Sequence, residues 1–353
     1  MLWDCSLPYP RLSCSPRGLI AATWYNDTSL RQVMIRHQAE EQHPNGDMHP
    51  FPPSNYPAIA SADWSVQWVA TMYDDFAWTN TTGRIARFWP QLVLYWKRVL
   101  SDVQADGRWT GSCLNDIRVT PNCPPGSTVC ASGIVTPWII ERLDMSVTMA
   151  QAIGQTAQAA AWQQTSDTLR STFLKTFTLP SSGNRPALLA AQAGRAPDGS
   201  WKPVGALQAS HTVAVYTNLW TGADALAAMD YVFPAPDGVP PGDVQRWNNP
   251  TFLRRALKAL SHVNRTQRAI HHLKERFDQY LPNSPANPVP LELQGPLGGP
   301  LPEYWISRID EGGLAPGVID RPQPGDGTGS HGWCGVALQW VATSLLGVYL
   351  VRS

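Results

Sequence analysis

The sequence predicts an all-α protein that folds as an (α/α)6 barrel. Apolar residues recur with helical spacing along most of the 353 residues, and the alternation typical of strands is scarce. Short turns such as 151–155 join neighbouring helices, while long segments rich in Pro and Gly separate the pairs. An open α-solenoid would instead show one recurring repeat of roughly 34–47 residues. The chain has no such repeat, so the closed barrel is the favoured prediction.

Antiparallel helix pairs are expected to follow one another along the chain. Asp63 is a suitable N-cap for the second helix, and Gly154 and Gly222 stand at two of the short turns. Residues 1–17 are expected to form an irregular segment, followed by a single barrel domain over residues 18–353. In such a barrel the long loops meet at one open end; here they cover 106–134, 181–206, 233–250 and 283–332. The expected helices cover 18–42, 63–72, 82–103, 136–153, 157–177, 206–219, 223–232, 252–261, 267–281 and 332–351.

The composition restricts the class of partner. Hydrophobic residues make up 43% of the chain and charged residues 15%, which is enough apolar surface for a large core. A formal net charge of zero and a pI near 7.1 disfavour nucleic acid and anionic membranes as partners. No apolar stretch approaches the roughly 18 residues of a membrane span, and the N-terminus lacks the features of a signal peptide. The 16 Trp residues fit either sugar stacking or packing between helices.

Three cysteines lie close together in one loop. Cys113, Cys123 and Cys130 are surrounded by Pro, Gly and Ser, and their spacing suits a loop disulfide better than a zinc site. We therefore expect neither a metal nor another cofactor. The disulfide gives a weak preference for a secreted protein, and the sequence leaves the compartment otherwise open.

Several predicted loops combine a carboxylate or an imidazole with aromatic residues. Glycoside hydrolysis needs one carboxylic acid to protonate the leaving oxygen and a second carboxylate to activate water or attack. Aromatic side chains then hold the sugar ring. A carbohydrate site fits these clusters better than phosphate or metal chemistry, whose motifs are missing from the chain. The clusters are Asp63-Trp64, the run Tyr73–Trp78 with Asp74 and Asp75, Trp109 with Asp116, Glu303 with Trp305, and His331 with Trp333.

Each cluster also has a structural interpretation. Asp63 could only cap its helix, Asp74 and Asp75 could be surface charges, and Asp116 could form a turn. His331 could be a hydrogen-bonded packing residue. Glu303 is the strongest functional candidate, because an idle carboxylate among apolar and aromatic neighbours would be costly to bury.

Motifs at both ends of the chain resemble those of glycoside hydrolase family 78, the α-L-rhamnosidases. The resemblance begins with Tyr25-Asn26-Asp27 and the turn Gln42-His43-Pro44-Asn45-Gly46-Asp47, and continues through Asp63-Trp64 to Asp106-Gly107. It ends with Pro302-Glu303-Tyr304-Trp305 and Ser330-His331-Gly332-Trp333. In total it covers about residues 18–350, and it rests on the order and spacing of loose motifs.

The resemblance implies an (α/α)6 barrel and the inverting hydrolysis of terminal α-L-rhamnose. It implies that Glu303 is the general base and that Asp63, Trp64, Asp116, His331 and Trp333 hold the rhamnose. Trp78 and Trp109, from the aromatic clusters, are further candidates for sugar binding. A carbohydrate is therefore the expected partner.

One segment departs from the family pattern. The family carries its general acid, a Glu, just before the first barrel helix, and residues 5–18 of this chain contain no Glu. Without its acid an inverting enzyme should be slower by roughly 10²–10⁴-fold. The usual β-sandwich domains before the barrel are also missing from the sequence, as expected of a truncated product. The alternatives are a catalytically silent sugar-binding barrel and, less favoured, an unsaturated glucuronyl hydrolase or a trehalase-like enzyme, since few Arg residues lie near the loop clusters.

Overall fold

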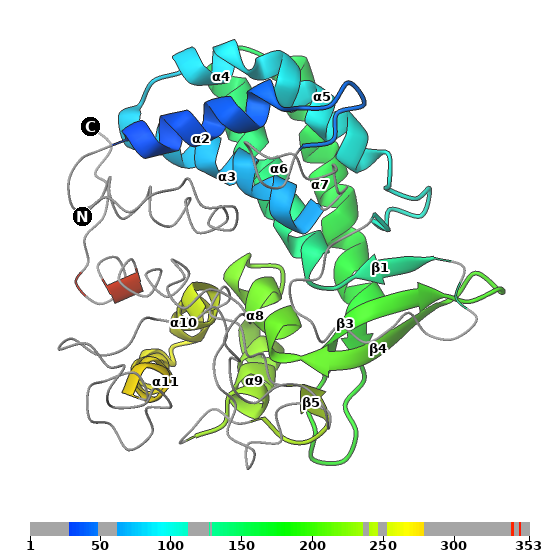
Figure 1. The fold of residues 1–353 in the computed structure, drawn as a ribbon. Coiled ribbons are helices and arrows are strands. Elements are labelled where there is room, and N and C mark those ends of the chain that lie inside the picture. The colour runs from blue at the N-terminus through cyan, green and yellow to red at the C-terminus, as the bar shows by residue number, and fades with distance from the viewer. Residues whose placement is uncertain are drawn as a thin grey trace, which may run out of the picture. The chain divides into compact units, whose positions relative to one another are not determined.

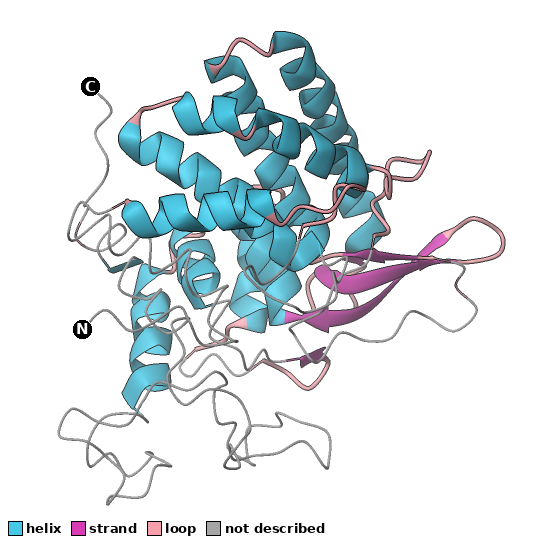
Figure 2. Ribbon diagram, turned by 45° about the horizontal axis from the view of Figure 1, so that its top comes forward, coloured by secondary structure: helices cyan, strands magenta, loops and turns pink. Residues whose placement is uncertain are grey.

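The computed structural model describes residues 28–48, 62–111, 127, 129–235, 240–245, 253–278, 340–341 and 346. Helices dominate these residues, as the sequence predicts (Figures 1 and 2). The chain divides into two compact units. The first holds helices α2 to α7, strands β1 and β2 and most of the β3–β4 hairpin, and the second holds α8 to α11 and β5. The single domain expected over residues 18–353 stays a prediction.

In the first unit, consecutive helices pack as antiparallel pairs. Helix α3 packs against α2 and α6, and α6 packs against α7 (Figure 1). Fully buried side chains from these helices, among them Trp68, Trp96 and Leu143, form its core. The Trp96 indole donates a hydrogen bond of 2.8 Å to Ser146 Oγ, which joins α5 to α6. The helices are α2 (Ser29–Glu40), α3 (Ala62–Thr79), α4 (Gly83–Arg87), α5 (Trp89–Leu100), α6 (Val135–Ala152) and α7 (Thr156–Phe177).

The prediction of one helix over 82–103 is wrong, because the chain forms two helices there. Helix α4 ends at Arg87 and α5 begins at Trp89, with Pro90 in the first turn of α5. Proline lacks the backbone N–H that a continuous helix would need, and its ring clashes with the carbonyl four residues earlier. In the first turn of a new helix neither cost arises. By contrast, α6 and α7 follow their predicted bounds within one residue and meet at Gly154, whose φ is +75°.

A β-hairpin occupies much of the predicted loop 181–206, which is a second correction. Strands β3 (Leu188–Arg195) and β4 (Trp201–Leu207) are its arms. The strand order is β1-β3-β4-β5, and the short β2 (Thr178–Leu179) pairs with β3. Strand β1 (Cys130–Ser132) is antiparallel to β3, with Ala131 opposite Ala193. Residues 188–191 of β3 are fully buried in succession, so the strand shows no polar alternation by which a sequence pattern would reveal it.

In the second unit, α10 packs against both α8 and α11, and α8 packs against α9. The Trp340 indole, which lies in the predicted last helix, donates a hydrogen bond of 3.3 Å to Ser261 on α10. None of the described helices is long and apolar enough to span a membrane. The elements are α8 (Gln208–Tyr216), α9 (Gly222–Val232), β5 (Val244–Gln245), α10 (Leu253–His262) and α11 (Thr266–Asp278).

Candidate active site

Helix α3 carries the first predicted sugar-binding pair in its first turn. The helix begins at Ala62, so Asp63 lies inside it rather than at the N-cap, and the N-cap prediction is wrong. The Asp63 side chain lies outside the described residues. The Trp64 side chain is half-buried. The sugar-binding role of both residues stays a prediction.

Trp78 lies at the opposite end of the same helix. Fourteen residues separate it from Trp64, which corresponds to about 21 Å along a helix. One sugar ring therefore cannot contact both indoles. The Arg31 guanidinium of α2 lies 5.8 Å from the centre of the Trp78 ring, so this indole contributes to the packing of α2 on α3.

The carboxylates beside Trp78 also connect helices. Asp75 is 1% exposed, and its Oδ2 accepts a hydrogen bond of 2.5 Å from Arg84 Nε of α4. The carbonyl of Asp74 accepts a hydrogen bond of 2.7 Å from Arg31 Nη1. Burial lowers the pKa of Arg31, and Asp74 and Asp75 partly offset that effect. In the described structure the run Tyr73–Trp78 therefore joins α2, α3 and α4.

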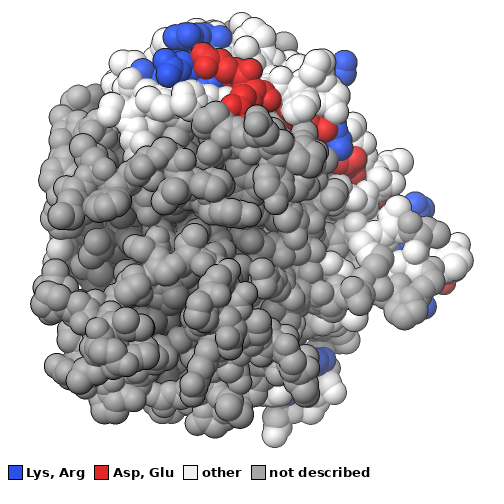
Figure 3. All heavy atoms as spheres, viewed as in Figure 1, with Lys and Arg blue, Asp and Glu red and all other residues white. Residues whose placement is uncertain are grey.

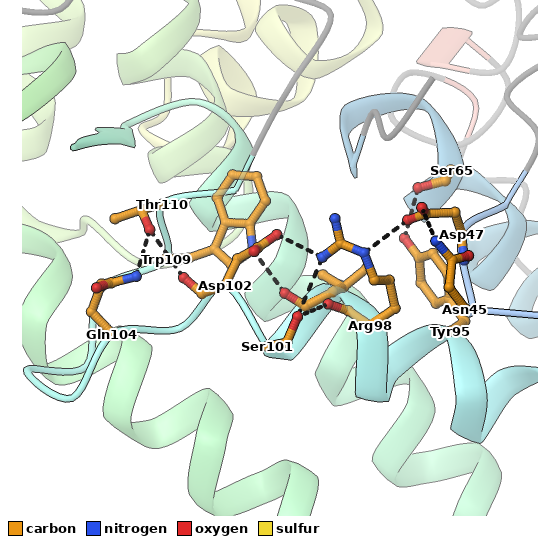
Figure 4. Close-up of polar contacts among 11 residues, drawn as sticks. Asn45, Asp47, Ser65, Tyr95, Arg98, Ser101, Asp102, Gln104, Trp109 and Thr110 are labelled. Carbon is orange, nitrogen blue, oxygen red and sulfur yellow. Dashed lines mark hydrogen bonds and ion pairs between the residues drawn. The ribbon is translucent and has the colours of Figure 1, made fainter. Parts of the chain in front are cut away.

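The turn Gln42–Asp47, which contributed to the family resemblance, docks on α5 (Figure 4). Gln42 Nε2 donates a hydrogen bond of 2.9 Å to the carbonyl of Gln91. Gly46 has a φ of +95°, and a Cβ at this position would lie 2.5 Å from the carbonyl oxygen of Leu94. Only glycine permits both this backbone conformation and this close approach. The motif therefore has a structural explanation, since it holds the chain against α5 just before the segment that leads to Asp63.

Arg98 of α5 links that turn to the chain that follows α5 (Figure 4). Its guanidinium lies 3.0 Å from Asp47 Oδ1 and donates a hydrogen bond of 3.0 Å to Asp102 Oδ2. Burial alone would lower the pKa of Arg98, but its ion pairs with Asp102 and Asp47 raise the pKa above its ordinary value. The cluster of Arg98, Asp102 and the neighbouring Trp109 is called the inner cluster below.

Trp109 belongs to the framework of this region. It is 1% exposed, and its indole N–H donates a hydrogen bond of 3.0 Å to the carbonyl of Val99 (Figure 4). It also forms a β-bridge with Val103, which closes the turn between them. This burial argues against the sugar contact predicted for Trp109, and we leave this residue out of the binding site proposed below. The predicted partner of Trp109, Asp116, lies outside the described residues.

A second cluster, which the sequence analysis missed, lies at the tip of the same turn. Trp201 of β4 donates a hydrogen bond of 2.9 Å from its indole N–H to Asp106 Oδ2. The Arg108 guanidinium lies over the indole, 5.2 Å from the ring centre. Asp106, Arg108 and Trp201 are called the outer cluster below. The signal that could have revealed it is the turn sequence Pro197-Asp198-Gly199, which predicts a hairpin with Trp201 next to its turn.

The remaining predicted site residues, Glu303, His331 and Trp333, lie outside the described residues, and their roles stay predictions. Cys130 is disulfide-bonded. Cys113 and Cys123 lie outside the described residues, so a disulfide within this loop stays a prediction. No group of His, Cys, Asp and Glu in the described part of the chain could hold a metal ion. On the face shown in Figure 3, the acidic and basic side chains of the described residues lie next to one another.

Solved structures with a similar fold include several bacterial rhamnosidases. The family 78 rhamnosidase of Bacillus sp. GL1 matches with a TM-score of 0.70 and 16% identity, over 97% of this chain and 32% of that one. The Klebsiella oxytoca rhamnosidase with rhamnose bound matches with a TM-score of 0.68 and 14% identity, over 96% of this chain and 58% of that one. The Streptomyces avermitilis α-L-rhamnosidase complexed with L-rhamnose matches with a TM-score of 0.67 and 15% identity, over 97% of this chain and 29% of that one. The chain thus spans only part of the length of each.

These likenesses define the fold as an (α/α)6 barrel, the class that the sequence predicts. The family model for the bacterial alpha-L-rhamnosidase six-hairpin glycosidase domain matches residues 17–231, which is more than half of the chain. The chain therefore belongs to this family, and the resemblance drawn from its motifs is confirmed. No curated protein matches the sequence.

Proposed function

We propose that this chain is the barrel of a glycoside hydrolase that removes terminal α-L-rhamnose from glycosides with inversion. The observation that carries the proposal is the family match over residues 17–231. Two structures of the same fold were solved with rhamnose bound, which supports a deoxy-sugar as the ligand.

In the proposed mechanism Glu303 is the general base. It takes a proton from a water molecule, which attacks the anomeric carbon from the face opposite the leaving oxygen. A second group must protonate that oxygen, and its pKa must be high enough to keep it protonated at the working pH. Asp63, Trp64, Asp116, His331 and Trp333 are the residues proposed to hold the rhamnose.

Asp144 is a described carboxyl group whose pKa is raised, and burial is the main cause. Its position nevertheless argues against the role of general acid. It lies in the middle of α6, accepts a hydrogen bond of 2.7 Å from Ser166 Oγ on α7 and pairs with Arg170. Both partners belong to the packing of α6 on α7, so Asp144 is assigned to that interface.

Hydrolysis of p-nitrophenyl α-L-rhamnoside by the purified chain and its Glu303→Gln variant tests the proposal. This substrate has a good leaving group and needs little help from an acid. We expect kcat to fall by roughly 10²–10⁴-fold in Glu303→Gln. The matched control is Glu40→Gln, which changes the same functional group at a side chain that is 56% exposed on α2, and should leave kcat unchanged. Equal activity of Glu303→Gln and the wild type would contradict the assignment.

The second candidate function is a sugar-binding barrel without turnover, and the absence of Glu from residues 5–18 favours it. It predicts that rhamnose raises the melting temperature while no aryl rhamnoside is hydrolysed. A series of aryl rhamnosides with increasingly poor leaving groups tests a third possibility, an enzyme that has the general base but lacks the general acid. If the acid is missing but the base is present, kcat will fall steeply along the series, because the leaving oxygen departs without a proton.

A further inference from the structure

We propose that Asn80 and Asn264 are sites of N-linked glycosylation. The chain contains three Asn-x-Ser/Thr tripeptides in which x is not Pro, the acceptor sequence for this modification. The tripeptides that begin at Asn80 and Asn264 lie in the described part of the chain, and Asn26, which begins the third, lies outside it. The proposal is independent of the proposed function, because it concerns the surface of the protein and none of the residues proposed to bind or hydrolyse a glycoside.

Both asparagines lie in short turns between consecutive helices. The turn 80–82 separates α3 from α4, and the turn 263–265 separates α10 from α11. Both residues are exposed. An N-linked glycan is bulky and hydrated, so it needs an attachment point from which it can extend into solvent. The two turns meet this requirement.

The backbone explains why asparagine occurs in these turns. The φ angle is +52° at Asn80 and +58° at Asn264. Asparagine adopts this left-handed region more readily than most residues and, like glycine, often ends a helix there. Behind Asn264 the N–H of Arg265 donates a hydrogen bond of 2.7 Å to the carbonyl of Leu260, the same pattern that the chain forms around Gly154. Asparagine at these positions is therefore no evidence of a modification by itself.

The threonine two residues later lacks a comparable structural explanation. A threonine at the start of a helix normally caps it, with its side-chain oxygen bound to a backbone N–H. Thr82 is the N-cap residue of α4, yet its side chain is exposed and forms no cap hydrogen bond. Thr266 is already the first residue inside α11. A hydroxyl group at this position is what an acceptor tripeptide requires.

Asn218 provides a comparison within the same chain. It is also exposed, has a φ of +57° and lies between α8 and α9. Two positions later the chain has Trp220, so the tripeptide lacks the hydroxyl group. The same local conformation thus occurs with and without an acceptor sequence. The modification should follow the threonine and not the shape of the turn.

The chemistry of the transfer fits a chain that passes through an oxidising secretory compartment. Cys130 is disulfide-bonded, and disulfides form and persist in such compartments. The donor is an oligosaccharide whose reducing end is linked to a lipid pyrophosphate. The side-chain nitrogen of the asparagine forms a bond to the anomeric carbon, and the bond from that carbon to the pyrophosphate oxygen breaks. The lipid pyrophosphate leaves with the bonding electron pair, and the amide nitrogen loses one proton to a base of the transferase.

Peptide mapping of the full chain, secreted from a eukaryotic host behind a secretion leader, tests the proposal. Peptide-N-glycosidase in water enriched in heavy oxygen converts each glycosylated asparagine into labelled aspartate, which mass spectrometry detects. We expect the label at positions 80 and 264 and unmodified Asn218. Thr82→Ala should lose the label at position 80 alone, because it removes the hydroxyl group and keeps the asparagine. The matched control Thr82→Ser keeps a hydroxyl group and should retain the label.

The outcomes decide the proposal for each site separately. An unlabelled position 80 or 264 in the wild type would overturn the assignment of that site. A label that persists in Thr82→Ala, or that also occurs at Asn218, would report deamidation and overturn the proposal. If Thr82→Ala is not secreted, Asn80→Gly replaces it, because glycine keeps the left-handed backbone; this variant should migrate faster in gel electrophoresis by the mass of one glycan. Equal migration of Asn80→Gly and the wild type would overturn the site at Asn80.

Discussion

The inner and outer clusters contain the same three residue types, and their Arg and Asp residues lie only a few positions apart in the chain, yet the two clusters differ in their surroundings. In the inner cluster Arg98 bridges Asp47 and Asp102, and Trp109 is buried with its N–H bound to a backbone carbonyl. In the outer cluster Arg108 pairs with Asp106, and Trp201 is half-exposed with its N–H bound to a carboxylate. The residue types are therefore a poor guide to their surroundings, and the exposed area of the indole distinguishes the buried inner cluster from the surface cluster.

The largest expected loss of stability follows the substitution of Trp109, the indole of the inner cluster. Trp109→Ala removes a fully buried side chain and its hydrogen bond to Val99, and should lower the free energy of unfolding by roughly 3–5 kcal/mol. Chemical denaturation followed by circular dichroism measures this loss. The half-buried Trp89 is the control, and Trp89→Ala should cost clearly less. A loss below about 1 kcal/mol for Trp109→Ala would remove the contrast between the clusters.

The next effect concerns the glycine in the turn that the two clusters share. Gly107→Ala should destabilise the chain by roughly 2–4 kcal/mol, because it combines backbone strain with a clash against Thr168. Gly154→Ala is a matched control: its φ is also positive, at +75°, but no atom lies within 4 Å of the new Cβ. The control should show the backbone strain alone, about 1–2 kcal/mol. If the two variants melt at the same temperature, Gly107 is not pressed against α7 in solution.

A smaller effect is expected at Arg98. Arg98→Met keeps the length of the side chain and removes both ion pairs, which should cost about 1–2 kcal/mol at low salt and less at high salt. The control is Arg36→Met on α2, whose ion pair with Glu40 spans 3.9 Å between exposed side chains. That variant should change stability by less than about 0.5 kcal/mol. Urea titrations at two salt concentrations measure both values. A salt-independent loss for Arg98→Met would point to packing instead of charge.

The smallest effect on stability is expected at the outer indole. Trp201→Ala removes a surface hydrogen bond and a cation–π contact, which together should contribute about 0.5–1.5 kcal/mol. Thermal melting of the variant beside Trp109→Ala gives the comparison directly. A loss as large as that of Trp109→Ala would mean that Trp201 also belongs to the core.

The sequence by itself determined the parts of this protein that depend on local pattern. Helical periodicity gave the helix pairs and the bounds of α6 and α7, and Gly154 marked the turn between them. The order of loose motifs pointed to the correct family. Turn chemistry and apolar spacing act over a few residues, which is why a single chain reveals them.

Other features were decided only by the tertiary structure. Strand β3 shows no polar alternation, since it is buried in succession by its surroundings. Trp64 and Trp78 both belong to sequence clusters of carboxylates and aromatic residues, but they lie at opposite ends of one helix. The burial of Trp109 depends on its contact with α5. The exposure of Trp201 depends on its contact with Arg108, which lies far away along the chain. The area that a side chain leaves to solvent is set by segments that meet only on folding, so the amino-acid type alone cannot specify it.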